Sequence, residues 1–187
     1  GAEVLALPVN RGKGAALGEA VLAHPDAPWY LLADADLAET AEHLTALVER
    51  LLVGDEELVV ARFPPAGTQA GAGRIKALSA AAIRSTTGVE VLEPLSGQRA
   101  IDGATLRSLH PAPRFGVEVG MSIDALRAGA RLAEVSLPLD HDHTGRGWAG
   151  RRHRIRQGID IVRTVWPRLG TPRLRLAVVL ALSVVAI

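Results

Sequence analysis

Hydrophobic and polar residues follow two repeating patterns along this chain. Short apolar runs bounded by polar residues predict strands, and apolar residues recurring every three or four positions predict amphipathic helices. The predicted strands cover residues 1–7, 29–33, 56–62, 100–102 and 131–138, and the predicted helices cover residues 15–24, 38–53, 74–87, 115–126 and 148–168. Alternation of strands with helices favours an α/β domain.

The run from Trp29 to Ala33 predicts a buried strand, and two carboxylates follow it at Asp34 and Asp36. Ligands of open α/β sheets lie at the carboxyl ends of strands. Residues two apart in extended chain point the same way, so the two carboxylates can share one divalent cation, Mg²⁺ or Mn²⁺, with a diphosphate supplying further oxygens. The alternative is a solvated strand end rich in Asp.

Two glycine turns carry polar groups suited to anions. The Gly12-Lys13-Gly14 turn at a predicted helix start exposes backbone N–H groups and one cation. The turn from Ser96 to Arg99 brings a hydroxyl, an amide and a guanidinium together, which suits a phosphate. A solvated turn is the alternative in both places.

Three further titratable residues are candidates for the site. Glu118 lies in the first turn of a predicted helix, where capping alone explains a carboxylate. His141 and His143 lie in an Asp-His-Asp-His run after the last predicted strand, where they can ligate a metal or titrate near neutral pH. Solvated loop histidines are the alternative.

Composition limits the class of protein. The chain has 187 residues, of which 48% are hydrophobic and 22% charged, which suits one compact domain with a substantial core. Cysteine is absent, which excludes disulfides and thiolate metal sites.

Positive charge is concentrated towards the carboxyl end. Residues 1–145 hold 12 Lys and Arg against 19 acidic residues, whereas residues 146–187 hold 9 Arg against Asp160. We expect residues 146–171 to form a basic amphipathic helix on an anionic membrane surface, and residues 172–187 to begin a truncated transmembrane helix. Nucleic-acid binding is the alternative interpretation of an Arg cluster, and the adjacent apolar tail favours lipid binding. The expected location is the cytoplasmic face of the plasma membrane.

Five ordered motifs carry a family resemblance: Asn10 to Gly14, Asp34-Ala-Asp36, Ser96 to Arg99, Phe115 to Glu118, and His143 to Arg146. With them the chain resembles family two glycosyltransferases of the GT-A type, close to the bacterial relatives of dolichyl-phosphate mannose synthase. The resemblance implies a Rossmann-like, mixed and mostly parallel sheet flanked by helices. It also implies a partial GT-A domain over residues 1–145 whose amino-terminal part is missing.

The resemblance also assigns roles to individual residues. It implies a catalytic role for Asp36, Arg99 and Glu118, and donor binding by Lys13, Asp34 and Asp36. The residues expected at the acceptor or phosphate are Arg62, Ser96, Gln98, Arg99 and Arg146, and those expected at the metal are Asp34, Asp36, His141 and His143. Guanidinium groups and a cation would then neutralise the departing diphosphate.

The implied activity is metal-dependent transfer of a hexose from a nucleotide-diphosphate sugar to a polyprenyl phosphate. One alternative is transfer to a soluble acceptor, as in the related glucosyl-3-phosphoglycerate synthases. An alternative of another class is a noncatalytic, membrane-tethered remnant. The family segments that hold the nucleobase and ribose have no counterpart in this sequence, so we expect the chain alone to be inactive.

Overall fold

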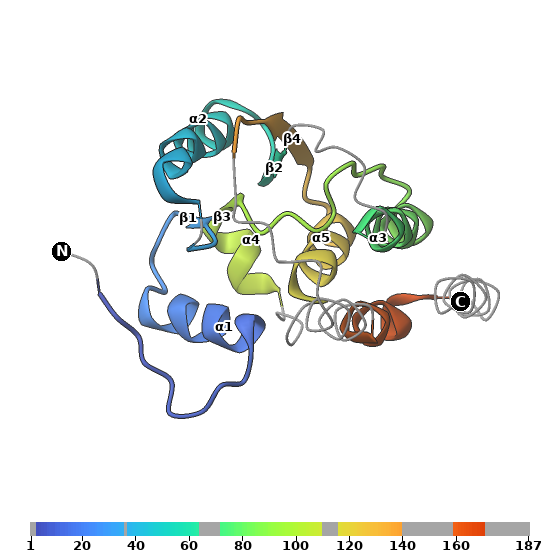
Figure 1. The fold of residues 1–187 in the computed structure, drawn as a ribbon, viewed down its shortest axis with the longest axis horizontal. Helices are drawn as coiled ribbons and strands as arrows, with labels where there is room; N and C mark the ends of the chain where they lie inside the picture. Colours follow the sequence, from blue (N-terminus) through green and yellow to red (C-terminus); the bar gives the residue numbers. More distant parts are fainter. Residues whose placement is uncertain (1–2, 36, 64–71, 110–115, 140–158, 171–187) are drawn as a thin grey trace.

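The computed structural model describes residues 3–35, 37–63, 72–109, 116–139 and 159–170 (Figure 1). Its elements are α1 (Lys13–Ala23), β1 (Trp29–Leu32), η1 (Ala38–Leu44), α2 (Thr45–Val53), β2 (Leu58–Arg62), α3 (Ala72–Thr87), β3 (Arg99–Asp102), α4 (Gly103–Ser108), α5 (Val117–Arg127), β4 (Leu132–Ser136) and η3 (Trp166–Arg168). Residues 159–165 are also helical. The strands and helices predicted between residues 13 and 136 are therefore present in the predicted order, and α4 is a further helix that the sequence pattern did not predict.

The four strands form one sheet in the order β1-β3-β2-β4. Strand β3 is antiparallel to both β1 and β2, and β2 is parallel to β4. The predicted mixed α/β sheet flanked by helices is confirmed. Strands β1, β2 and β4 run in the same direction and β3 runs against both of its neighbours, which is the mixed, mostly parallel arrangement expected.

The strand directions place several segments at one end of the sheet. We call this end, where β1, β2 and β4 finish and β3 starts, the carboxyl edge. Leu32 at the end of β1 pairs with Arg99 at the start of β3, and Arg62 at the end of β2 pairs with Ser136 at the end of β4. The segments that follow β1, β2 and β4 and the turn that precedes β3 therefore meet at one edge. This edge is where an α/β sheet places ligands.

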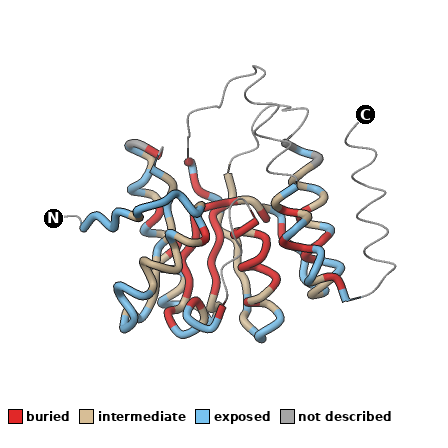
Figure 2. The backbone as a smooth tube through the Cα atoms, turned by 90° about the horizontal axis from the view of Figure 1, so that it is seen from below, coloured by how far each residue is buried: buried red, intermediate tan, exposed pale blue. Residues whose placement is uncertain are grey.

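Alternation along β2 builds the two sides of the core. Val59 and Ala61 pack with α2, whereas Leu58 and Val60 pack with α4 and α5. All four side chains are fully buried. Side chains of successive strand residues point to opposite faces, so one central strand supplies both layers. Figure 2 shows buried residues gathered along the middle of the sheet and on the helices beside it.

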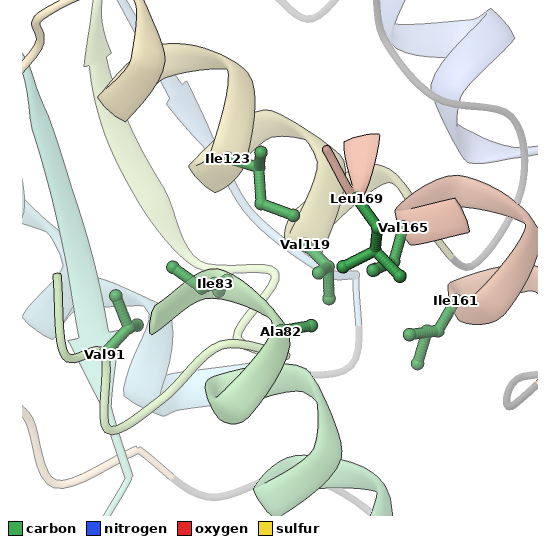
Figure 3. Packing of buried hydrophobic residues seen from close by; sticks show 8 residues of the cluster. All are labelled: Ala82, Ile83, Val91, Val119, Ile123, Ile161, Val165 and Leu169. Atoms are coloured by element: carbon green, nitrogen blue, oxygen red, sulfur yellow. The ribbon is translucent and has the colours of Figure 1, made fainter. Parts of the chain in front are cut away.

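A third cluster joins α3, α5 and the helical residues 159–165 (Figure 3). Ile161 and Val165 pack with Ala82 of α3 and Val119 of α5. The Arg168 guanidinium donates to both carboxylate oxygens of Asp124, its Nε lying 2.7 Å from Oδ1. The carboxyl-terminal helical residues described here are therefore part of the domain core.

Two expectations about strands are wrong, and one apolar residue of a predicted amphipathic helix is exposed. Residues 3–7 form no strand, and Val4 is 85% exposed. Strand β1 is an edge strand that pairs with β3 alone in the described chain, so its residues are partly exposed and not buried. Leu52 is 64% exposed. It lies one residue beyond the α2 face that packs on the sheet, where a helix turns by about 100° per residue.

The carboxyl-terminal helix, which was predicted to be amphipathic, buries one of its apolar faces against the domain. Ile159 and Trp166 are 45% and 39% exposed, whereas Ile161 and Val165 are buried. No helix in the described residues is long and apolar enough to cross a bilayer. Residues 140–158 and 171–187 lie outside the described residues, so the interfacial helix and the truncated span stay predictions.

Candidate functional site

Three charged side chains from distant segments meet at the carboxyl edge of the sheet. The Lys13 ammonium lies 2.7 Å from Asp34 Oδ1 and 2.9 Å from Glu118 Oε1. Lys13 begins α1, Asp34 follows β1, and Glu118 lies in the first turn of α5. We call these three residues the charged triad. The structure thus joins three residues that the sequence singled out separately.

Local structure places Lys13 and Glu118 in the charged triad. Gly12 adopts φ 90°, a backbone conformation that residues with a Cβ rarely adopt. Its N–H donates to Asn10 Oδ1 at 2.9 Å. This turn starts α1 with Lys13 at its first position. Glu118 is only 13% exposed, because α5 packs against the sheet and against α3.

The electrostatics keep Lys13 charged. Burial lowers its pKa, but the attraction of Glu118 and Asp34 outweighs burial, and the net result is a raised pKa. An ammonium between two carboxylates leaves one net negative charge. The triad therefore presents carboxylate oxygens beside a fixed ammonium at a partly exposed site, an arrangement able to orient a hydroxyl group.

Gln98 holds Asp34 from the sheet side. Its Oε1 accepts from the Asp34 backbone N–H at 3.0 Å, and its Nε2 donates to Asp34 Oδ2 at 3.0 Å. Gln98 is 3% exposed. Gln98 was predicted to bind phosphate. This prediction is corrected, because both polar atoms of its buried amide bond to Asp34.

Gly97 is a site residue that sequence reasoning missed. A Cβ at this position would lie 2.7 Å from Lys13 Nζ and would also collide with the Asp34 carboxylate. Only a residue without a side chain leaves room for the Lys13–Asp34 pair. The glycine of the Ser96 to Arg99 turn was a signal for such a close approach.

Arg99 does not face a phosphate. It is 1% exposed, and its guanidinium donates to the carbonyl oxygens of Pro94, Ser96 and Glu118 and to Ser122 Oγ. Burial lowers its pKa to about 10, against the attraction of Glu118 and Glu134. The predicted catalytic and acceptor roles of Arg99 are therefore corrected: Arg99 ties the turn before β3 to helix α5.

The other predicted anion ligands divide into two groups. Ser96 is 3% exposed, and its Oγ accepts from the Gln98 backbone N–H at 3.3 Å, so it supports the turn and does not face a ligand. Arg62 ends β2 at the same edge as the charged triad and is partly exposed. Its predicted contact with a phosphate stays a prediction.

Four predicted site residues, Asp36, His141, His143 and Arg146, lie outside the described residues. Among the described residues, no group of three or more His, Asp or Glu side chains is arranged to hold a metal ion. We expected guanidinium groups to neutralise the departing diphosphate, and this expectation is corrected for Arg99. At Asp34 the observed cation is the ammonium of Lys13, because the Arg99 guanidinium is enclosed by α5 and its own turn.

Comparison with known proteins supports the fold. A scan against models of protein families finds no match. The chain nonetheless has the GT-A fold of family two glycosyltransferases and is homologous to members of that class.

The particular relatives are glucosyl-3-phosphoglycerate synthases. The protein of that name from Mycolicibacterium paratuberculosis is 33% identical over 183 residues, covering 89% of this chain and 54% of the relative. The Mycobacterium tuberculosis enzyme in complex with Mn²⁺, UDP and phosphoglyceric acid matches with a TM-score of 0.71 and 30% identity, covering 89% of this chain and 57% of that one. Its complex with Mg²⁺ and UDP matches with a TM-score of 0.70 and 31% identity. The chain spans about half the length of these relatives.

Proposed function

We propose that this chain carries part of a glycosyltransferase site that moves a hexose from a nucleotide-diphosphate sugar to a phosphorylated acceptor. The observation that carries the proposal is the charged triad, in which Lys13, Asp34 and Glu118 converge from three segments on one sheet edge. Side chains brought together across such sequence distances, with Gly97 making room for them, indicate a built site.

The chemistry of transfer gives each triad member a role. Departure of a nucleotide diphosphate leaves negative charge on its oxygens, and a preorganised ammonium lowers the energy of that charge. Lys13 supplies this cation. Glu118 accepts hydrogen bonds at its carboxylate and is held 2.9 Å from Lys13, so it is suited to orient a sugar or acceptor hydroxyl beside the leaving group. Asp34 keeps the ammonium in place from the other side.

The relatives favour a soluble acceptor over the polyprenyl phosphate first expected. Their names and complexes refer to phosphoglycerate, UDP and UDP-glucose. We therefore propose UDP-glucose as the donor and 3-phosphoglycerate as the acceptor. Both acceptors present a phosphate, and the sequence motifs alone did not separate them.

The proposed reaction includes a divalent cation, but the described residues form only part of a site for it. The related structures contain Mn²⁺ or Mg²⁺ with UDP. In this chain Asp34 offers hard carboxylate oxygens, but both already accept hydrogen bonds, from Lys13 and from Gln98. The described residues do not form a complete metal site, so none of the steps above is routed through a metal.

A transfer assay tests the proposal. The full protein encoded by the gene is incubated with Mn²⁺ and UDP-glucose labelled in the sugar, and 3-phosphoglycerate or a polyprenyl phosphate is added separately. We expect label in the phosphoglycerate product alone. Label only in the lipid would reinstate the polyprenyl acceptor, and no transfer to either would support the noncatalytic alternative.

A further inference from the structure

The pairing between β1 and β3 stops before the charged triad is reached. The last paired residues are Leu32 and Arg99, and Asp34 lies two residues beyond. At this point a side chain continues the contact between the two segments. Gln98 makes two hydrogen bonds of 3.0 Å to Asp34, one to its backbone N–H and one to its carboxylate, across 64 residues of sequence.

The orientation of the Gln98 amide follows from its partners. A backbone N–H only donates and a carboxylate only accepts, so Oε1 must face the N–H and Nε2 must face Oδ2. A rotated amide would set donor against donor and oxygen against oxygen. The two contacts therefore form a reciprocal pair that fixes both the backbone and the side chain of Asp34.

Gln98 is itself held rigidly. Its backbone carbonyl accepts from the Ala61 N–H at 3.0 Å, and its backbone N–H donates to Ser96 Oγ at 3.3 Å. The next residue, Arg99, fastens the same turn to α5. The side chain is 3% exposed, so it does not exchange its bonds to Asp34 for bonds to bulk water.

We propose that Gln98 is a positioning residue that sets the direction of the Asp34 carboxylate, and through it the place of the Lys13 ammonium. With Oδ2 held by Gln98, Oδ1 is presented to Lys13 at 2.7 Å. The consequence for turnover rests on the proposed function, whereas the positioning itself does not. An amide, not a carboxylate, is required, because only the amide donates to Oδ2.

Two substitutions separate the two hydrogen bonds. Gln98→Glu keeps an acceptor for the Asp34 N–H but sets a second carboxylate against Oδ2. Gln98→Met has similar length and keeps neither bond. Hydrogen exchange of the Asp34 amide, followed by NMR, reports the first bond without any substrate. We expect exchange at least tenfold faster in Gln98→Met and near the wild-type rate in Gln98→Glu.

Kinetics of the full protein report the second bond. We expect both variants to lower kcat for UDP-glucose by tenfold or more, with Gln98→Glu the more severe, because it adds a negative charge beside the triad. Asp102→Ala is the matched control at the other end of β3: it removes the helix cap on the Thr105 N–H, lowers the melting temperature, and leaves kcat unchanged.

The outcomes are distinguishable from failure of the proposed function. If wild-type protein transfers no sugar, the exchange rates still decide whether Gln98 fixes Asp34. Unchanged exchange of the Asp34 amide in folded Gln98→Met would overturn the positioning role. So would kcat values of both Gln98 variants that match that of Asp102→Ala in an active enzyme.

Discussion

The two edges of the sheet contain similar residue types and use them differently. At the carboxyl edge, Lys13, Asp34 and Glu118 contact one another across large sequence distances. At the opposite edge, a cleft of about 360 Å³ contains acidic side chains as well, among them Glu57 and Asp102.

The acidic groups of the opposite edge serve the fold. Asp102 caps α4 by accepting from the Thr105 N–H at 2.8 Å, and Glu57 accepts from the Arg131 backbone N–H at 2.7 Å. Glu56 pairs with Arg50. Asp102 and Glu57 thus each satisfy a backbone N–H, and Glu56 is held by an ion pair with a side chain. The comparison teaches that a cleft alone is weaker evidence for function than a group of charged side chains that contact one another and, within the described residues, do not cap a helix or satisfy a backbone N–H.

The largest expected effect comes from removing the cation of the charged triad. Lys13→Met leaves Asp34 and Glu118 facing each other without compensation and removes the charge proposed to stabilise the leaving diphosphate. We expect kcat/KM for UDP-glucose to fall about 100-fold. Steady-state kinetics of the full protein measure it.

Arg131→Met is the matched control at the opposite edge, where Arg131 pairs with the exposed Asp55 and with Glu57. We expect kcat/KM within about twofold of wild type, because surface ion pairs contribute about 0–1 kcal/mol to stability. Equal losses in the Lys13 and Arg131 variants would remove the distinction between the edges.

Arg99→Met tests the corrected role of the buried guanidinium. The substitution leaves the carbonyl groups of Pro94, Ser96 and Glu118 without their donor, so we expect a loss of about 3 kcal/mol in the free energy of unfolding. Urea denaturation measures this loss. A stable variant with a selective loss of phosphoglycerate binding would restore the acceptor role.

Gly97→Ala tests the close approach at the site edge. The added methyl group overlaps the Lys13–Asp34 pair, so we expect kcat/KM to fall about tenfold. Gly18→Ala is its counterpart within α1, where a Cβ meets no atom within 4 Å. That variant should gain about 0.5–1 kcal/mol of stability from helix propensity and keep its activity. Identical behaviour of the two variants would argue against a crowded site.

The smallest effect is a pH dependence of stability from Lys13. Its folded pKa is raised above 10.5, so the stabilisation is fully present below pH 10.5 and is lost as pH rises through the folded pKa. We expect the difference in unfolding free energy between wild type and Lys13→Met to be constant from pH 7 to pH 9 and to shrink above pH 10.5. Lys13 is 45% exposed, so solvent screening keeps this effect small. A difference that grows with alkaline pH would contradict the sign.

Sequence periodicity predicted the elements well because their apolar positions repeat at helix or strand spacing. It could not predict the exposure of β1: the run from Trp29 to Leu32 is apolar, and burial depends on whether a second strand lies beside it. For the same reason, the sequence pattern did not predict that Ile161 is buried while Ile159 is 45% exposed. Which face of a helix is buried depends on its packing partners, here α3 and α5.

The site was predictable residue by residue but not as an arrangement. Lys13, Asp34 and Glu118 stood out through their turns and element ends. Arg99 was misassigned because an arginine on a glycine turn has the same sequence signature whether it faces solvent or is enclosed by α5. The bonds between Gln98 and Asp34 span 64 residues, a separation that carries no local pattern.

The most direct measurement of the central claim is calorimetric titration of the full protein with UDP in the presence of Mn²⁺. The account predicts that Lys13→Met binds UDP at least tenfold more weakly than wild type, while Arg131→Met binds it with unchanged affinity. Equal affinity of wild type and Lys13→Met, with both proteins folded, would contradict the assignment of the carboxyl edge as the nucleotide-sugar site.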